Sequence, residues 1–90
     1  MSKDITVIYL STSTCAPCKT FFPLAEQKCS QVHGNIVKVV MDKIPLTEKQ
    51  YYVEKYCVKS VPFSIVLQSG LLKRTVVGSK IEELEELLNR

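Results

Sequence analysis

The chain has 90 residues, of which 46% are apolar and 23% charged. It contains four cysteines, and its formal net charge is +3. This length suits a single domain, residues 1–90, with a small aliphatic core. The basic residues are dispersed and do not alternate with aromatics, which argues against nucleic-acid binding.

The sequence also argues against a membrane or secreted protein. No apolar run reaches membrane-spanning length, and the first ten residues lack the hydrophobic region and cleavage site of a signal peptide. Four cysteines in a short chain are compatible with a secreted disulfide scaffold, but the ample aliphatic residues disfavour one. We therefore expect a cytoplasmic monomer.

A strand followed by a helix is predicted first. Residues 5–10 form an apolar, β-branched run too short for a helix, which indicates a buried strand. The polar residues 11–14 end it. From Cys15 to about Cys29, apolar residues recur at helical spacing, so a helix is predicted to begin at Cys15.

A second strand and a second helix follow. Residues 31–35 give a helix stop, and residues 36–41 indicate a second buried strand, which would pair in parallel through a crossover connection. After a loop at 42–46, the pattern Thr47-x-x-Gln50 has the form of a capping box. It predicts a short helix to about Tyr56, whose apolar side is formed by Tyr52, Val53 and Tyr56.

The last third of the chain predicts a hairpin and a helix. Residues 63–67 alternate as a strand, Ser69-Gly70 is a tight-turn signal, and residues 71–77 supply the partner strand. A second capping box, Ser79-x-x-Glu82, precedes an apolar stripe formed by Ile81, Leu84, Leu87 and Leu88. The order β-α-β-α-β-β-α predicts an α/β fold with a four-stranded mixed sheet flanked by helices.

The chemically informative motif is Cys15-Ala16-Pro17-Cys18. Residues three apart on a helical turn lie about 5–6 Å from one another, within reach of a disulfide. At a helix N-terminus, free N–H groups and the dipole stabilise a thiolate, and Pro17 fits a turn that needs no N–H donor. We expect Cys15 to be the nucleophile, assisted by the Lys19 cation, and the more buried Cys18 to be the resolving thiol.

Other interpretations of the cysteines remain open. Cys15-x2-Cys18-x10-Cys29-x3-His33 offers the ligands of a structural zinc site, although a continuous helix would separate Cys29 from Cys18 by about 15 Å. His33 fits better as a surface or helix-end residue. Cys29 is expected to be a buried apolar residue, and Cys57 either the same or a site of regulatory oxidation.

At this point the chain resembles the thioredoxin family over nearly its whole length. Cys15-Ala16-Pro17-Cys18-Lys19 is similar to the family motif C-G-P-C-K, Pro23 matches its helix-kinking proline, and residues 56–62 resemble Y-x-V-x-x-V/I-P. The resemblance implies a thioredoxin-like fold. It also implies a cis Val61–Pro62 bond, where the unaided expectation is a trans proline at an edge strand. Further family counterparts are Lys38, Asp42 and Gly78.

The family also has features that this sequence lacks. Thr14 stands where the family usually has Trp before the first cysteine, and Tyr9 stands where it has a buried Asp; Tyr9 or Lys38 could replace that carboxylate through a water. The four residues before the first predicted strand are too few for the family's N-terminal strand and helix. This shortness, and the segment 78–84, resemble glutaredoxins, which however typically carry C-P-Y-C.

The resemblance implies a thiol-disulfide oxidoreductase that reduces protein disulfides, with ribonucleotide reductase as a plausible client. Its electrons would come from an NADPH-dependent thioredoxin reductase, and it would need no metal or cofactor besides the Cys15-Cys18 disulfide. The implied substrate-binding residues are Thr14, Ala16, Pro17, Val61, Pro62 and Gly78. A glutathione-dependent glutaredoxin and an accessory binding subunit with incidental thiols are the alternatives.

Overall fold

The computed structural model describes residues 4–89. Its elements follow the predicted order and are, in sequence, β1 (Ile5–Ser11), α1 (Ala16–Gln31), β2 (Asn35–Val40), α2 (Leu46–Tyr56), β3 (Phe63–Gln68), β4 (Leu71–Val77) and α3 (Ile81–Leu88). Among the described residues, no helix is long and apolar enough to cross a membrane.

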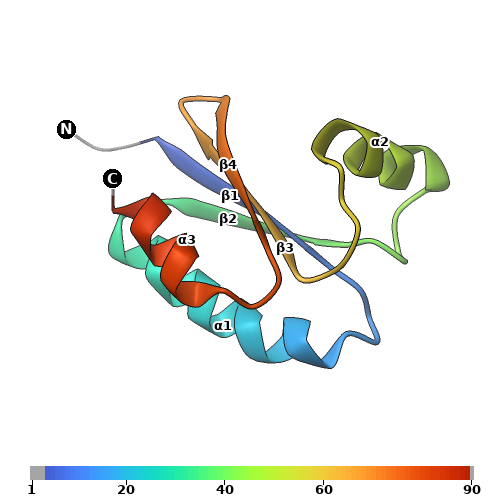
Figure 1. Cartoon of the computed structure of the whole chain (residues 1–90), viewed down its shortest axis with the longest axis horizontal. Helices are drawn as coiled ribbons and strands as arrows, with labels where there is room; N and C mark the ends of the chain where they lie inside the picture. The colour runs from blue at the N-terminus through green and yellow to red at the C-terminus, as the bar shows by residue number, and fades with distance from the viewer. Residues whose placement is uncertain (1–3, 90) are drawn as a thin grey trace.

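The four strands form one mixed sheet in the order β2-β1-β3-β4 (Figure 1). β1 pairs in parallel with β2 and antiparallel with β3, and β3 pairs antiparallel with β4. The hairpin turns at Ser69 and Gly70, and both residues have positive φ. Glycine adopts this conformation without steric cost, which explains Gly70 at the second position of the turn. The predicted four-stranded α/β fold is confirmed.

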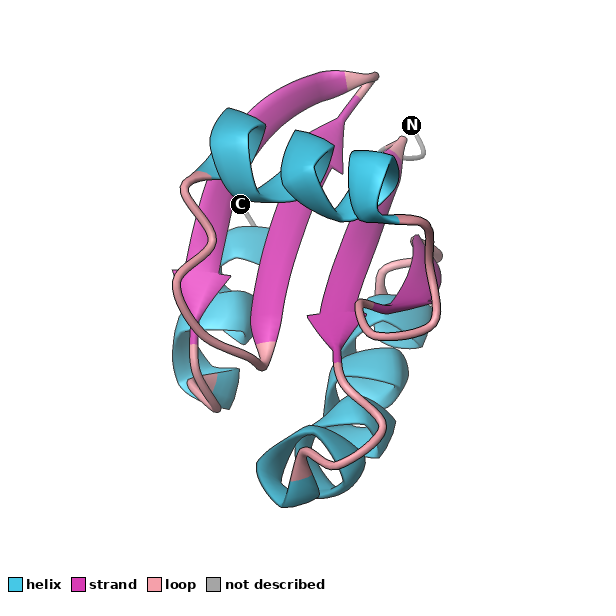
Figure 2. Cartoon of the chain, turned by 90° about the vertical axis from the view of Figure 1, so that its right-hand side faces the viewer, coloured by secondary structure: helices cyan, strands magenta, loops and turns pink. Residues whose placement is uncertain are grey.

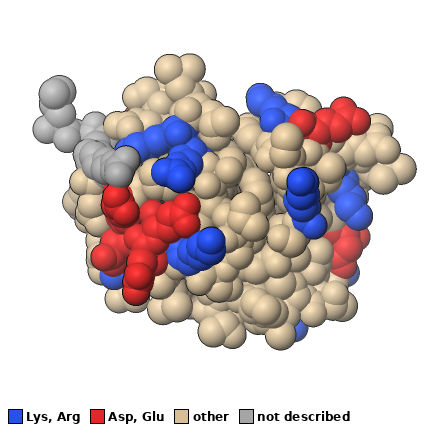
Figure 3. All heavy atoms as spheres, viewed as in Figure 1, with Lys and Arg blue, Asp and Glu red and all other residues tan. Residues whose placement is uncertain are grey.

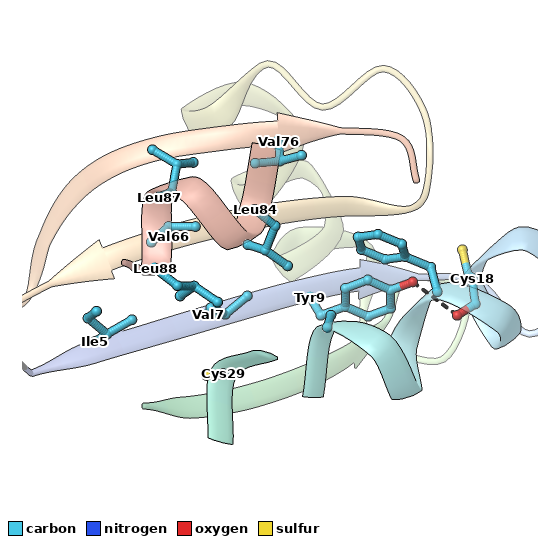
Figure 4. Close-up of a cluster of buried hydrophobic side chains, with 12 residues drawn as sticks. Ile5, Val7, Tyr9, Cys18, Cys29, Val66, Val76, Leu84, Leu87 and Leu88 are labelled. Atoms are coloured by element: carbon cyan, nitrogen blue, oxygen red, sulfur yellow. Dashed lines mark hydrogen bonds between the residues drawn. The ribbon is translucent and has the colours of Figure 1, made fainter. Parts of the chain in front are cut away.

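Helices cover both faces of the sheet (Figures 1 and 2). Alternate residues of β1 point to opposite faces. On one face Val7 and Tyr9 pack against α1 and α3 (Figure 4). The leucines of the predicted apolar stripe of α3, Leu84, Leu87 and Leu88, are buried on this face. On the other face Leu10 joins Phe63, Ile65 and Met41, with Tyr52 and Tyr56 of α2 packed against them.

α2 is less well covered than the sequence predicted. No residue of α2 is buried, and Val53, assigned to its apolar side, is 38% exposed. Tyr52 and Tyr56 are half-buried, so only part of the predicted apolar side faces the core. α2 therefore lies on the sheet with much of its surface open to solvent.

The prediction that the second strand is buried is wrong. β2 is an edge strand, and Val37 in its middle is 50% exposed. The strand is apolar in sequence, but it has a neighbour on one side only. Burial of a strand depends on what its flanks and faces meet, which an apolar run does not specify.

The two predicted capping boxes are also absent. α2 begins one residue earlier than Thr47, with Pro45 at its N-cap, and α3 begins at Ile81 with Lys80 at its N-cap; neither cap makes a side-chain hydrogen bond. The first helix likewise begins at Ala16 and continues to Gln31, so that Cys15 is its N-cap instead of its first helical residue.

Candidate active site

The two cysteines of the motif form a disulfide at the start of α1. Their sulfurs are 2.13 Å apart and their Cα atoms 5.3 Å apart, as the spacing predicted. Cys15 has extended backbone and its Sγ accepts a hydrogen bond from the Cys18 backbone N–H at 3.1 Å. Cys15 is half-buried, whereas Cys18 is only 2% exposed. Of the two sulfurs, that of Cys15 is therefore the one a partner can reach more readily.

Beneath Cys18 lies a buried tyrosine. The Tyr9 hydroxyl donates a 3.0 Å hydrogen bond to the Cys18 carbonyl oxygen (Figure 4), and the ring packs on Phe21 and Phe22 with centroids 5.8 and 5.1 Å away. Burial raises the pKa of Tyr9 to about 12. The phenol is therefore protonated near neutral pH and acts as a hydrogen-bond donor.

Lys38 approaches the same cluster from the edge strand. It is the partner of Tyr9 in the β1–β2 register, and its Nζ lies 5.0 Å from the centroid of the Phe22 ring. The interaction is a cation–π contact. Lys38 and Tyr9 thus both contact Phe22.

A second contact fixes the turn before Cys15. The Asp42 carboxylate, just beyond β2, accepts hydrogen bonds from the Ser13 hydroxyl and, at 2.9 Å, from the Ser13 backbone N–H. These bonds, the hydroxyl bond first, lower the pKa of Asp42. The Cys15 N–H in turn donates to the Thr12 carbonyl at 3.3 Å. The redox turn, residues 12–18, is thereby tied to the end of β2.

The Val61–Pro62 peptide bond is cis, as the family resemblance implied. The Gly78 N–H donates a 2.8 Å hydrogen bond to the Pro62 carbonyl, and Gly78 has φ +80°, a conformation that favours glycine. Cys15 and Val61 are both half-buried and pack against the same hydrophobic core. Thr14, Ala16 and Pro17 are exposed at the redox turn.

Two grooves adjoin the redox turn. The apolar groove, of about 460 Å³, is lined by Ala16, Pro17, Thr20, Phe21, Leu24, Ser79 and Ile81. The lysine groove, of about 180 Å³, is lined by Thr12, Met41, Lys49, Val53, Val58, Lys59, Ser60 and Val61. The redox turn contributes Ala16 and Pro17 to the apolar groove and Thr12 to the lysine groove, so both grooves adjoin this turn.

The other predicted residues lie apart from the disulfide or at the surface. Lys19 is exposed and Pro23 stands inside α1. The Cys29 thiol is buried and donates to the Asn35 carbonyl at 3.3 Å; burial raises the pKa of Cys29. Cys57 and His33 are exposed.

The zinc alternative finds no support in this arrangement. Cys15 and Cys18 are bonded to each other, and Cys29 makes its contact at the far end of α1. Within residues 4–89, no group of three or more His, Cys, Asp or Glu side chains is placed to hold a metal ion.

Sequence reasoning missed two contacts of this site and the lysine groove beside it. The Ser13–Asp42 contact joins residues 29 apart. Tyr9 was considered a substitute for a carboxylate, not a donor to a backbone carbonyl. Lys49 and Lys59 carried no signal, because they lie in separate segments and only the fold brings them to one groove.

The fold and the site together define a class of protein. A disulfide at the first turn of a helix, with one sulfur accessible and the other buried beside a sheet, is the arrangement expected of a thiol-disulfide oxidoreductase. The cis Val61–Pro62 bond near the redox turn is the further feature that the resemblance implied.

Comparison with known proteins identifies the family. The Thioredoxin family profile matches residues 1–90. Thioredoxin of Bacillus subtilis is 40% identical over 77 residues, which cover 84% of this chain and 71% of the relative. Thioredoxin H3 of Arabidopsis thaliana is 30% identical over 83 residues, covering 92% and 67%.

Solved structures agree. A thioredoxin pre-protein of Schistosoma mansoni, in reduced form, superposes with a TM-score of 0.79 at 26% identity and covers 98% of this chain and 79% of its own. The chain belongs to the thioredoxin family, and it is a thiol-disulfide oxidoreductase whose redox-active pair is Cys15 and Cys18.

Proposed function

We propose that this protein reduces disulfides of protein clients, with Cys15 as the attacking thiol and Cys18 as the resolving thiol. The observation that carries the proposal is the unequal exposure of the two cysteines: Cys18 is 2% exposed, whereas Cys15 is half-buried, and its neighbours in the redox turn line two grooves. A client disulfide can approach Cys15 more readily than Cys18.

In the first step the Cys15 thiolate attacks one sulfur of the client disulfide. A new S–S bond joins Cys15 to the client, the client S–S bond breaks, and the departing client thiolate takes a proton from solvent. The Cys18 N–H, which donates to the Cys15 sulfur, lies at the positive end of α1 and stabilises that thiolate.

In the second step Cys18 loses its proton and attacks the Cys15 sulfur. The mixed disulfide breaks, the client leaves as a dithiol, and two electrons have passed from the cysteine pair to the client. Tyr9 keeps its own proton because its pKa is raised to about 12. We therefore assign Tyr9 to positioning Cys18 through the carbonyl bond, and the Cys18 proton passes to the departing client thiolate or to water.

Client docking is assigned to the residues around the cis bond. By family analogy, the backbone of Val61 pairs with an extended client segment, and Gly78, held against the Pro62 carbonyl, leaves room for that chain. The exposed Thr14, Ala16 and Pro17 complete the rim. Lys19 contributes a cation at the surface of α1.

The oxidised pair must then be reduced again. We propose an NADPH-dependent thioredoxin reductase as electron donor and a reducing, cytoplasmic setting, with ribonucleotide reductase among the clients. The matching C-x-P-C-K motif supports the reductase over glutathione, because the glutaredoxin resemblance extends only to chain length and to residues 78–84.

The test compares cysteine variants in NADPH-coupled reduction of insulin, with thioredoxin reductase or with glutathione and glutathione reductase as the donor. Cys15→Ser should abolish turnover. Cys18→Ser should accumulate a covalent client complex that runs as a heavier band on non-reducing gels. Cys57→Ser, at an exposed cysteine outside the site, is the matched control and should keep wild-type turnover.

Three outcomes would contradict parts of this proposal. Turnover retained by a Cys15→Ser, Cys18→Ser double variant would favour an accessory binding role. Equal or faster recycling by glutathione would favour a glutaredoxin. A covalent complex formed by Cys15→Ser instead of Cys18→Ser would reverse the roles of the two thiols.

A further inference from the structure

The lysine groove differs in chemistry from the apolar groove, which also adjoins the redox turn. Its interior is formed by Met41, Val53, Val58 and Val61, and its only charged lining residues are Lys49 and Lys59. The apolar groove has no charged lining residue. Within the described part of the chain, the two surfaces beside the disulfide therefore offer different charges to a client.

The two lysines are available to a partner. Neither Lys49 nor Lys59 makes a side-chain hydrogen bond or ion pair with another residue among 4–89; Lys55, by contrast, donates to Tyr51 at 2.8 Å. In Figure 3 basic and acidic side chains are interspersed over α2, whereas the large acidic cluster lies over α3. The positive charge at the groove is thus not neutralised by an internal partner.

The nearby acidic residues do not line the groove. Asp42, next to Met41, accepts two hydrogen bonds from Ser13. Glu48 and Glu54 are the sequence neighbours of the lining residues Lys49 and Val53 on α2, but neither glutamate is a lining residue. The lining of the groove therefore combines aliphatic side chains with two lysines and no acidic residue.

The size of the groove indicates the kind of occupant. Its volume of about 180 Å³ is below the roughly 300–1,000 Å³ of small-molecule sites. It suits one or two side chains of a larger partner. Thr12 and Val61 connect it to the redox turn and to the cis bond, where the proposed client segment runs.

We propose that the lysine groove is a specificity subsite for the client protein, and that it takes an aliphatic side chain accompanied by an acidic one close to the cysteine that is reduced. The aliphatic group packs on Val53, Val58 and Met41, and the carboxylate pairs with Lys49 and Lys59. This inference rests on the proposed function, since it names the class of client segment for the same site.

The experiment uses synthetic peptides with one cysteine as a mixed disulfide with thionitrobenzoate, whose release is followed by absorbance. Peptides carry Leu-Asp or Leu-Asn, either before or after the cysteine. We expect one Asp peptide to react about two- to tenfold faster with the reduced protein than its Asn counterpart, the range expected for one or two exposed ion pairs. The ratio should fall toward one in high salt.

Charge variants assign the preference to the groove. In Lys49→Gln, Lys59→Gln the Asp/Asn ratio should fall to about one. In Lys49→Glu, Lys59→Glu the ratio should fall below one, and an added Leu-Lys peptide should react faster than the Asn peptide. The matched control, Arg74→Gln with Lys80→Gln, removes two charges at exposed positions outside the groove. It should keep the wild-type ratio, and circular dichroism checks each fold.

Several results would overturn the proposal. The proposal would be wrong if the wild-type Asp/Asn rate ratio were one, or if the Lys49→Gln, Lys59→Gln variant kept the wild-type ratio. It would also be wrong if the control variant lost the preference to the same extent. If the Gln pair slowed reduction of a glutathione mixed disulfide but left the Asp peptide unaffected, the groove would bind glutathione instead. If wild-type protein failed to reduce even the Asn peptides, the proposed function itself would fall, and the subsite with it.

Discussion

Replacing Tyr9 with phenylalanine removes a buried hydrogen bond and little else. The ring is fully buried, and its packing on Phe21 and Phe22 is retained in the variant. Near neutral pH the loss of the bond to the Cys18 carbonyl should cost about 1 kcal/mol of the free energy of unfolding, the usual net value of an intramolecular hydrogen bond.

The effect should change with pH, and the sign follows from the pKa. An exposed tyrosine has a pKa of 10.0, whereas burial in the folded protein raises the pKa of Tyr9 to about 12. The unfolded chain therefore releases this proton first, so the stabilisation is complete below pH 10 and is lost as pH rises toward 12. At pH 11 the wild type should have lost about 1.4 kcal/mol through this residue, while Tyr9→Phe has no such group to ionise.

The two proteins should thus converge. The advantage of the wild type, about 1 kcal/mol at pH 8, should fall to about zero by pH 11. The chain has no tryptophan, so urea unfolding of the oxidised proteins is best followed by far-ultraviolet circular dichroism. The prediction would be refuted if the stability difference between the two proteins stayed constant from pH 8 to 11, or grew. Either result would show that the pKa of Tyr9 is not higher in the folded protein than in the unfolded chain.

Two further predictions concern the redox turn and the end of α1. Asp42→Asn should lower the thermal midpoint at pH 7 but make less difference at pH 3. The hydrogen bonds from Ser13 lower the pKa of Asp42 in the folded protein, so the stabilisation by this carboxylate is present above its unfolded pKa and is lost as pH falls. An equal shift of the midpoint at both pH values would contradict this. Gly34→Ala places a Cβ 2.9 Å from the Cys29 sulfur and 3.2 Å from the Ile5 carbonyl oxygen, so it should cost about 1–3 kcal/mol in denaturant unfolding. Adding Cys29→Ala should cost less than the two single changes together, and strict additivity would rule out the sulfur clash.

The order of elements was predictable because each depends on nearby residues. The predicted stripe of the last helix recurs at helical spacing; its three leucines, Leu84, Leu87 and Leu88, are buried, and Ile81 is half-buried. The exposure of β2 was not predictable in the same way, because Val37 looks like a core residue until the strand order places it at an edge. Strand order is set by contacts between distant segments, which a local pattern does not contain.

Helix starts failed for a different reason. Thr47 and Ser79 have the side chains of good caps, but a cap also needs extended backbone at the residue directly before the first helical one. Pro45, with φ −58° and ψ 150°, already meets that requirement two residues before Thr47. The cap residue alone therefore does not decide where a helix begins.

The features of the candidate site likewise fall into those that were predictable from nearby residues and those that depend on distant segments. The disulfide-forming pair was predictable from four consecutive residues, and the cis bond from its resemblance to a family segment. The contact of Asp42 with Ser13, and the groove that Lys49 and Lys59 both line, each involve separate segments. They became visible only when β2, α2 and the loop before β3 were placed around the redox turn.

The sulfur of Cys15 is both the N-cap of α1 and one half of the redox pair. Helices are commonly capped by a side-chain oxygen whose charge stays the same, but in the mechanism proposed above the capping sulfur alternates between thiolate and disulfide. A thiolate is a strong acceptor for the Cys18 N–H, whereas a disulfide sulfur is a weak one. The N-cap of α1 is therefore stronger in the reduced protein than in the oxidised one. Oxidation of the cysteine pair weakens the hydrogen bond that caps the start of α1.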